Sequence, residues 1–307
     1  MKRVVFLLFP GFELLDFAGP LQVFHEAKKL GLDLELVFSG TTPSLASEQG
    51  LVFNDLVPFP EFRPGDDVFI PGFTLEITPT RPDLVKAILR AHQSGARIVS
   101  TCSGTFMVGQ AGLLDGRSCT THWKRVEELQ KRYPRTTVLT DRLFVEDRGL
   151  ITCGGVTCGI DLALSQMEQE RGPLFASRIA RELILYIRRD KDHSQVSVYL
   201  EYRDHQNPSI HAVQDWMIDH PDQGADLHAL AAIGGMSPRN FTRAFRSVTG
   251  ISPGEYRTLL RLERASVLLK NPSLTVEAVA SESGFRDARA LRRLWAKRYG
   301  LSPRTAS

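Results

Sequence analysis

Cys102 is the residue of this sequence best placed to do chemistry. It stands in VSTCSGTFMVGQAGLLDG, where an apolar run ends at Thr101 and a helical pattern begins after a few small residues. A thiol on such a strand-to-helix turn is exposed at a helix N-terminus, where backbone N–H groups and the helix dipole lower its pKa. The alternative is a small buried hydrophobe, the ordinary fate of a lone cysteine. The position favours a functional pocket.

Three further residues lie at or just beyond the ends of strand-like runs: Asp16, Gly72 in IPGF and His122 in TTHW. Ligands of open parallel sheets bind outside the carboxyl ends of the strands, so these residues are expected to share one pocket with Cys102. Asp16 could equally begin a helix, and His122 could cap one. Both interpretations stay open.

A second group of candidates lies in the basic C-terminal third. Gly250-Ile251-Ser252-Pro253 returns fifty residues later as GLSP, and Arg239 and Arg243 recur as arginines at the same interval. Each copy predicts a short helix, a turn containing Gly and a basic second helix, which is the helix-turn-helix plan. Ser237 is expected to cap the basic helix of the first copy, and Asp287 that of the second.

The outward side chains of these two basic helices have the chemistry to bind DNA. In the major groove, Arg bonds guanine in bidentate fashion and Thr contacts the thymine methyl group, while further cations contact phosphates. The alternative is a helical bundle with arginines on its surface, which the recurrence of Arg at one repeat position disfavours. The outward residues are Arg239, Thr242, Arg243, Arg289, Arg292 and Arg293, and the phosphate contacts are Arg246, Lys297 and Arg298.

The elements that must position these residues fall into two groups. Strand-like runs begin at Arg3, Leu34, Asp66 and Ala96 and recur within 142–155, with helical patterns at 20–30, 82–94, 122–132, 159–170 and 173–187. This alternation predicts an α/β doubly wound, flavodoxin-like sandwich. After Pro208 all patterns are helical, which predicts an all-α tandem helix-turn-helix domain. The expected organisation is a ligand-sensing domain at 1–188, a linker at 189–208 and a DNA-binding domain at 209–307.

Composition agrees with two soluble domains and excludes other classes. The 307 residues are 42% hydrophobic and 24% charged, which excludes a disordered chain. The charge is uneven, because from Ser237 onward 14 Lys and Arg face 5 Asp and Glu. Four cysteines without a C-x-x-C pair are expected to be reduced thiols in the cytoplasm. The apolar N-terminus is broken by Pro10 and Asp16, so we expect neither a secretion signal nor a membrane span.

Residues 209–303 resemble the AraC/XylS DNA-binding domain. The motifs that carry the resemblance are SPRNFTRAFRSVTGISPGEYRTLLRLERASVLL and the closing GLSP. The resemblance implies two helix-turn-helix units joined by a long helix at about 253–270. It places base reading on Arg239, Thr242 and Arg243 in the first unit and on Ala288, Arg289 and Arg293 in the second. Ala288 offers only apolar contact.

Residues up to about 188 resemble the PfpI/class I glutamine amidotransferase-like superfamily, more closely its GlxA-type regulators and the isocyanide hydratases. The matching motifs are FLLFPGFELLDFAGP, IPGF, TCSGTFMVGQAGLLDG and CTTHW. The resemblance implies that Cys102 is the elbow thiol, that Asp16 is its acidic neighbour, and that the backbone at Gly72 and Ser103 forms an oxyanion-type nest. PfpI proteases carry His directly after the Cys, where this chain has Ser103, so the Cys–His couple for acyl transfer is missing.

These observations predict a sequence-specific transcriptional regulator, expected to be an activator, rather than an enzyme. By resemblance, its effector is a small, nitrogenous metabolite held by Cys102, Asp16, Gly72, Ser103 and His122. We expect double-stranded DNA and the effector as partners, a homodimer formed through the α/β domain, and contact with RNA polymerase, with no cofactor or metal. The alternatives are a cysteine-dependent hydratase or hydrolase, or a thiol redox sensor, joined to a DNA-binding tail.

Overall fold

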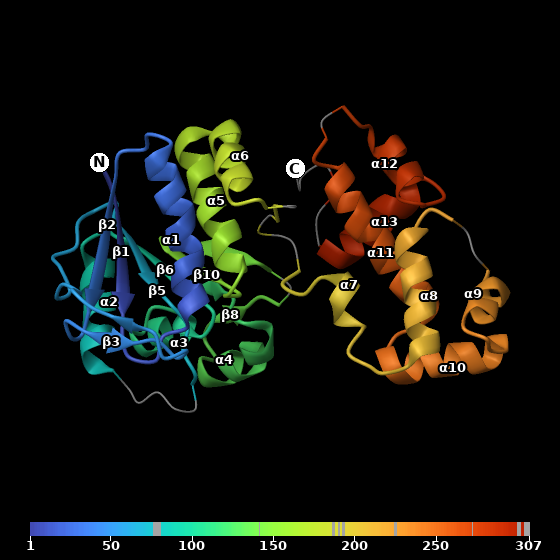
Figure 1. The fold of residues 1–307 in the computed structure, drawn as a ribbon, viewed down its shortest axis with the longest axis horizontal. Helices are drawn as coiled ribbons and strands as arrows, with labels where there is room; N and C mark the ends of the chain where they lie inside the picture. Colours follow the sequence, from blue (N-terminus) through green and yellow to red (C-terminus); the bar gives the residue numbers. More distant parts are fainter. Residues whose placement is uncertain are drawn as a thin grey trace. The chain divides into compact units, whose positions relative to one another are not determined.

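The chain folds into an α/β unit, Met1–Gln195, and a helical unit, Val196–Ser307 (Figure 1). The computed structural model describes residues 1–75, 81–140, 142–185, 188–189, 191, 194–223, 226–271, 273–299 and 302–303. The division between the units lies within the stretch 189–208 that the sequence predicts as a linker.

A six-stranded sheet forms the centre of the α/β unit, in the order β2-β1-β5-β6-β10-β9. All neighbours are parallel except the edge pair of β10 and β9. The central strands are buried apolar runs, as a parallel sheet covered by helices requires. The bounds are β1 Lys2–Leu8, β2 Leu34–Gly40, β5 Asp67–Ile70, β6 Arg97–Thr101, β9 Phe144–Asp147 and β10 Leu150–Cys153.

The helices of this unit pack in two groups. α1 (Leu14–Lys29), α5 (Cys158–Arg171) and α6 (Pro173–Glu182) contact one another, and α2 (Pro82–Gln93) contacts α3 (Gly104–Gln110). The doubly wound, flavodoxin-like α/β class predicted from the alternation is confirmed. One difference is that the helix predicted at 122–132 is divided into the 3-10 turn η1 (Trp123–Arg125) and α4 (Val126–Arg132). Another is that α6 ends at Glu182, near Ile184 with its φ of 54°. Residues 186–187 of that predicted helix lie outside the described residues.

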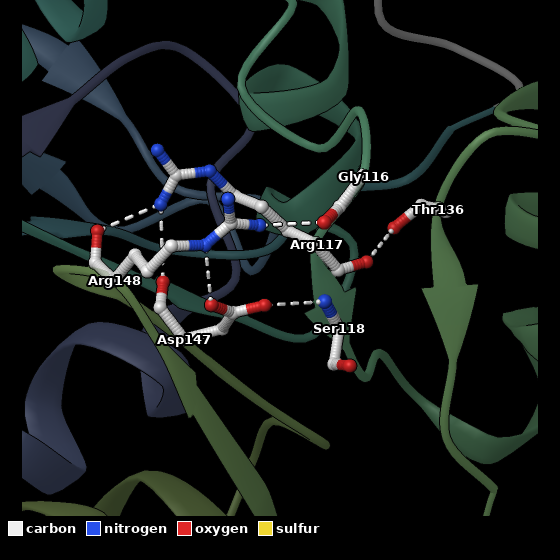
Figure 2. A network of polar contacts seen from close by, with 6 residues as sticks. All are labelled: Gly116, Arg117, Ser118, Thr136, Asp147 and Arg148. Carbon is white, nitrogen blue, oxygen red and sulfur yellow. Dashed lines mark hydrogen bonds and ion pairs between the residues drawn. The ribbon is translucent and has the colours of Figure 1, made fainter.

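Two short strand pairs complete the unit: β3 (Leu45–Ala46) with β4 (Val52–Phe53), and β7 (Ser118–Cys119) with β8 (Thr137–Val138). Figure 2 shows how β7 is tied to the turn between β9 and β10. Arg117 donates to the carbonyls of Asp147 and Arg148, and the Asp147 carboxylate accepts from the Ser118 N–H. This network fixes the residues that lead to Thr120 and Thr121, beside the end of β6.

The helical unit has two cores that share one helix. Phe241, Phe245, Tyr256 and Leu260 belong to the first core, and Leu262, Ala265, Leu291 and Trp295 to the second. α11 (Pro253–Leu268) contributes to both, as a long helix joining two helix-turn-helix units must. The remaining helices are α7 Val198–Glu201, α8 Pro208–Asp219, α9 Leu227–Ile233, α10 Pro238–Thr249, α12 Val276–Glu282 and α13 Ala288–Tyr299.

Within the described residues, no helix is both long and apolar enough to cross a membrane.

The start of α11 is fixed by a reciprocal cap. Ser252 Oγ accepts from the Glu255 N–H at 3.2 Å, and Glu255 Oε2 accepts from the Ser252 N–H at 2.8 Å. Replacing Ser252 with alanine is therefore expected to lower the free energy of unfolding of the helical unit by about 1 kcal/mol. Urea unfolding of the full chain, followed by circular dichroism, measures this. The exposed Ser247, inside α10, provides the control: if Ser247→Ala costs as much, the cap is not the cause.

Candidate effector site and nucleic-acid interface

Cys102 occupies the turn between β6 and α3, in an unusual backbone conformation. Its φ is 52°, in the left-handed region that residues other than glycine seldom adopt. Three hydrogen bonds hold its backbone there. Its N–H donates to the Cys153 carbonyl at 3.0 Å, and its carbonyl accepts from Thr121 Oγ1 at 2.8 Å and from the Thr105 N–H at 3.4 Å. Strained residues of this kind are held in place by their surroundings and concentrate at functional sites.

Two glycines allow the neighbouring loops to close on this cysteine. A Cβ at Gly72 would lie 2.3 Å from Asp16 Oδ2 and 2.7 Å from Cys102 Cβ. A Cβ at Gly155 would lie 2.2 Å from Cys102 Cβ. Because real Cβ atoms do not approach so closely, only glycine fits at either position. The loops after β5 and β10 thus meet at Cys102.

Asp16, in the first turn of α1, is the acidic group of this site and is only 2% exposed. Its Oδ2 accepts from the Gly72 N–H at 3.0 Å, and its Oδ1 accepts from the Val156 N–H. Burial raises the pKa of Asp16 to about 6, and the two N–H donors, together with the thiol of Cys102, limit the rise. The carboxylate is thus poised to gain a proton just below neutral pH.

The pKa of the Cys102 thiol is raised in the structure, whereas the sequence predicts a lowered one. Burial raises its pKa strongly, and the negative charge of Asp16 raises it further. The Ser103 N–H faces the sulfur and offsets this only in part. The sequence-based argument from the helix N-terminus fails because desolvation outweighs the field of a helix of seven residues. The raised pKa favours the protonated thiol at neutral pH over an activated thiolate nucleophile.

One of the two N–H groups of the implied oxyanion-type nest already has a partner in this structure. The Gly72 N–H is committed to Asp16. The Ser103 hydroxyl accepts from the Phe73 N–H at 2.7 Å and donates to the Phe73 carbonyl at 2.6 Å. Gly72 and Ser103 therefore brace the loop after β5 around Asp16 and Cys102.

His122 differs from the other predicted pocket residues, because within the part of the chain that the structure describes its side chain contacts its own segment and not Cys102 or Asp16. It caps η1, with Nδ1 accepting from the Lys124 N–H at 3.3 Å, and its ring stacks on Trp123. Burial and the nearby cations of Lys124 and Arg125 lower its pKa. Among the contacts found in the described ranges, none joins this ring to Cys102 or Asp16. This agrees with the missing Cys–His couple.

Sequence reasoning missed three members of this site: Thr121, Gly155 and Val156. Val156 has a φ of 50° and donates its N–H to Asp16, 140 positions away. The Gly154-Gly155 pair directly after the strand β10 was a usable signal, because paired glycines at the carboxyl end of a strand allow close approach to a ligand site.

The helix α10 presents a basic face opposite its two buried phenylalanines. Phe241 and Phe245 are fully buried, whereas Arg239, Arg243 and Arg246 are exposed. The predicted cap is present, since Ser237 Oγ accepts from the Asn240 N–H. Thr242 is half-buried and its hydroxyl donates to the Pro238 carbonyl at 2.9 Å, which leaves its methyl group for contacts. Asn240, which the sequence analysis did not single out, accepts from Arg243 Nη2 at 3.3 Å.

The helix α13 repeats this arrangement with two differences. Leu291 and Trp295 are buried, and Asp287 caps the helix as predicted. The exposed cations are Arg289, Arg292, Arg293, Lys297 and Arg298. Ala288 departs from the base-reading prediction: at 9% exposure it belongs to the second core, because the first residue of α13 faces inward. Arg292 is exposed, as predicted, and differs from its counterpart in α10 by forming an ion pair with Glu277 of α12 at 3.0 Å.

Two protein-family models match the chain. The model of the DJ-1/PfpI family matches residues 2–169, and that of a helix-turn-helix domain matches residues 230–306. The first match spans the sheet and the Cys102 site, and the second spans α10 and α13.

Curated relatives share this two-part organisation over nearly the whole chain. The HTH-type transcriptional regulator GbdR of Pseudomonas aeruginosa is 30% identical over 312 residues, covering 99% of this chain and 83% of GbdR. The HTH-type transcriptional regulator CdhR of the same organism is 28% identical over 302 residues, covering 97% of this chain and 89% of CdhR.

The isonitrile hydratase of Pseudomonas putida is 32% identical over 168 residues, covering 54% of this chain and 71% of the hydratase.

Solved structures support the fold of the α/β unit. An AraC family transcriptional regulator from Pseudomonas putida superposes with a TM-score of 0.54 at 22% identity, covering 60% of this chain and 100% of that one. The chain therefore belongs to the DJ-1/PfpI family and, within it, to the HTH-type transcriptional regulators that carry a C-terminal AraC-type DNA-binding domain.

Proposed function

We propose that this regulator is a transcriptional activator of the cytoplasm, controlled by a small nitrogenous metabolite that binds at the Cys102 site. It would act as a homodimer through the α/β unit and contact RNA polymerase at the promoter. The observation that carries the proposal is the combination, in one chain, of a closed Asp16–Cys102 site with two capped helices of exposed arginines.

The chemistry of the site supports binding rather than turnover. A half-buried thiol whose pKa is raised, beside a carboxylate, lacks the thiolate that acyl transfer and peroxide sensing both require. The Gly72 N–H, one of the two backbone donors that would stabilise an oxyanion, is already bonded to Asp16. What remains is a polar centre of defined shape, at the strand ends where open α/β sheets bind ligands.

The exposed arginines support direct reading of DNA by α10 and α13. Arg239 and Arg243 lie about one turn apart on α10, opposite its buried face, which suits a helix in the major groove. Arg289 and Arg293 repeat this spacing on α13. Arg246, Lys297 and Arg298 lie further along the two helices, where we propose that they contact phosphates.

Substitution of Cys102 by Ala and by Ser tests the role assigned to the thiol. We expect both variants to keep DNA affinity, measured on a site selected from random DNA, and to lose at least about tenfold in effector-dependent transcription from a reporter. The full reporter response from both variants would contradict a role for the thiol in sensing. Loss of DNA affinity in both would instead show that Cys102 supports the fold alone.

A further inference from the structure

Gln195, the last residue of the α/β unit, places its side-chain amide in a slot lined by oxygen atoms. Its Nε2 donates to the Thr121 carbonyl at 2.8 Å, to the Arg142 carbonyl at 3.0 Å and to Thr120 Oγ1 at 3.2 Å. Thr120 Oγ1 gives its own hydrogen to the Leu139 carbonyl, so toward Gln195 it can only accept. The position occupied by Nε2 therefore requires a donor.

The carboxamide of Gln195 fills this slot incompletely. An amide nitrogen carries two hydrogens for three acceptors, and Gln195 Oε1 is buried without a partner among the described residues. A primary ammonium group has three N–H donors and no acceptor to satisfy, so it matches the three oxygens better. Gly154 provides the room, because a Cβ there would lie 2.5 Å from the Gln195 side chain.

The slot shares two walls with the Cys102 site. Thr121, whose carbonyl accepts from Gln195, donates its hydroxyl to the Cys102 carbonyl at 2.8 Å. Gly154 is followed by Gly155, the residue that lies against Cys102 Cβ. A ligand that moves Cys102 would therefore also act on Thr121, because Thr121 is hydrogen-bonded to both Cys102 and Gln195.

The slot also fixes the chain where it leaves the α/β unit. One residue, Val196, separates Gln195 from Ser197, whose hydroxyl caps α7, and Val198 is already buried in the first core of the helical unit. Upstream, the Lys191 carbonyl accepts from the Leu143 N–H at 3.0 Å. Release of Gln195 would thus free the connection directly before the DNA-binding unit.

We infer that this slot is a nitrogen-donor site, occupied in this structure by the chain's own Gln195, and that a ligand with a primary ammonium group takes its place. Ligand entry and release of the linker are then one event. This inference rests on the proposed effector control and assigns the chemical class of the effector. The loop that contains Thr120 and Thr121 would then link effector binding at the Cys102 site to release of Gln195.

The test opens the slot in the full-length chain with Gln195→Ala and adds methylammonium chloride as the probe. At saturation, the probe is expected to raise the melting temperature of this variant by about 2–4 °C. Tetramethylammonium chloride at equal ionic strength, which lacks N–H donors, is expected to leave it unchanged. Adding Gly154→Ala, whose methyl group fills the slot, is expected to abolish the rise. An equal response to both salts would overturn the inference.

Amide hydrogen exchange reports on the linker in the same proteins. Gln195→Ala is expected to speed exchange of the peptide over 194–200 by at least about tenfold, whereas Gln110→Ala, at the end of α3, is expected to leave it unchanged. Unchanged exchange in Gln195→Ala would overturn the role of the slot in holding the linker. Selection of binding sites from random DNA tests the proposed function separately. If no site is enriched, the proposed function is wrong, whether or not methylammonium stabilises the variant.

Discussion

Replacing Arg243 with alanine is expected to weaken binding to the specific DNA site by about 1–3 kcal/mol, while binding to random DNA changes little. Arg243 is exposed on α10, and its guanidinium is braced by Asn240 at 3.3 Å, which limits the entropy lost when it bonds guanine. Fluorescence anisotropy at fixed salt, on a selected site and on a random duplex of equal length, measures both affinities.

Two arginines of the same chain give matched controls for Arg243. Arg246→Ala, which removes a proposed phosphate contact on the same helix, should weaken both duplexes alike. Arg178→Ala removes an exposed charge from α6 of the α/β unit and should change neither. If Arg243→Ala lowers affinity for the random duplex as much as for the selected one, Arg243 contacts phosphate and does not read a base.

The burial of Asp16 is expected to make the free energy of unfolding fall as pH rises from about 4 to 6. The folded chain holds the Asp16 proton up to a pKa of about 6, whereas the unfolded chain releases it near 3.8. Between these values the native state binds more protons, so stability decreases with rising pH and levels off above the folded pKa. The whole effect is about 3 kcal/mol. Urea unfolding at several pH values measures it.

The variant Asp16→Asn isolates this contribution from the other titrating groups. The amide cannot ionise, so the difference in stability between wild type and variant should change across this pH window. The mismatch of the Asn amide with the Gly72 and Val156 N–H donors adds a constant offset. Asp115→Asn, the same change at an exposed carboxylate, is the control. A pH-independent difference for Asp16→Asn would show that burial does not raise its pKa.

Much of the fold could be predicted because its signals are local. The continuous apolar runs at Arg3 and Ala96 predict β1 and β6, since a strand covered on both faces needs no alternation. The start of α10 follows from Ser237-Pro238, a cap followed by a first helical residue. Asp16 and Gly72 lie together because each belongs to the segment that follows one of two neighbouring parallel strands: Asp16 lies in the first turn of the helix after β1, and Gly72 lies in the loop after β5.

The features that could not be predicted from the sequence depend on contacts between distant segments. The pKa of Cys102 depends on loops that reach it from Gly72 and Gly155, and no pattern around residue 102 reports them. Ala288 was assigned to DNA from the resemblance to the AraC/XylS domain, but a matching motif fixes the helix and not which of its ends is covered. Gln195 lies in a polar stretch that composition marks only as a linker.

Because α11 belongs to both cores of the helical unit, we expect the distance between the two DNA contacts proposed for α10 and α13 to be part of what this protein recognises. A helix of 16 residues is a rod of about 24 Å without a joint. Two helix-turn-helix units held by such a rod can both contact DNA only where their two elements face the same side of the duplex. The duplex makes one turn in about 10.5 base pairs. Moving the elements apart by half a turn places one element on the far side of the DNA, with every base still present. We therefore expect the operator to be defined by the spacing of its elements as well as by their base sequence.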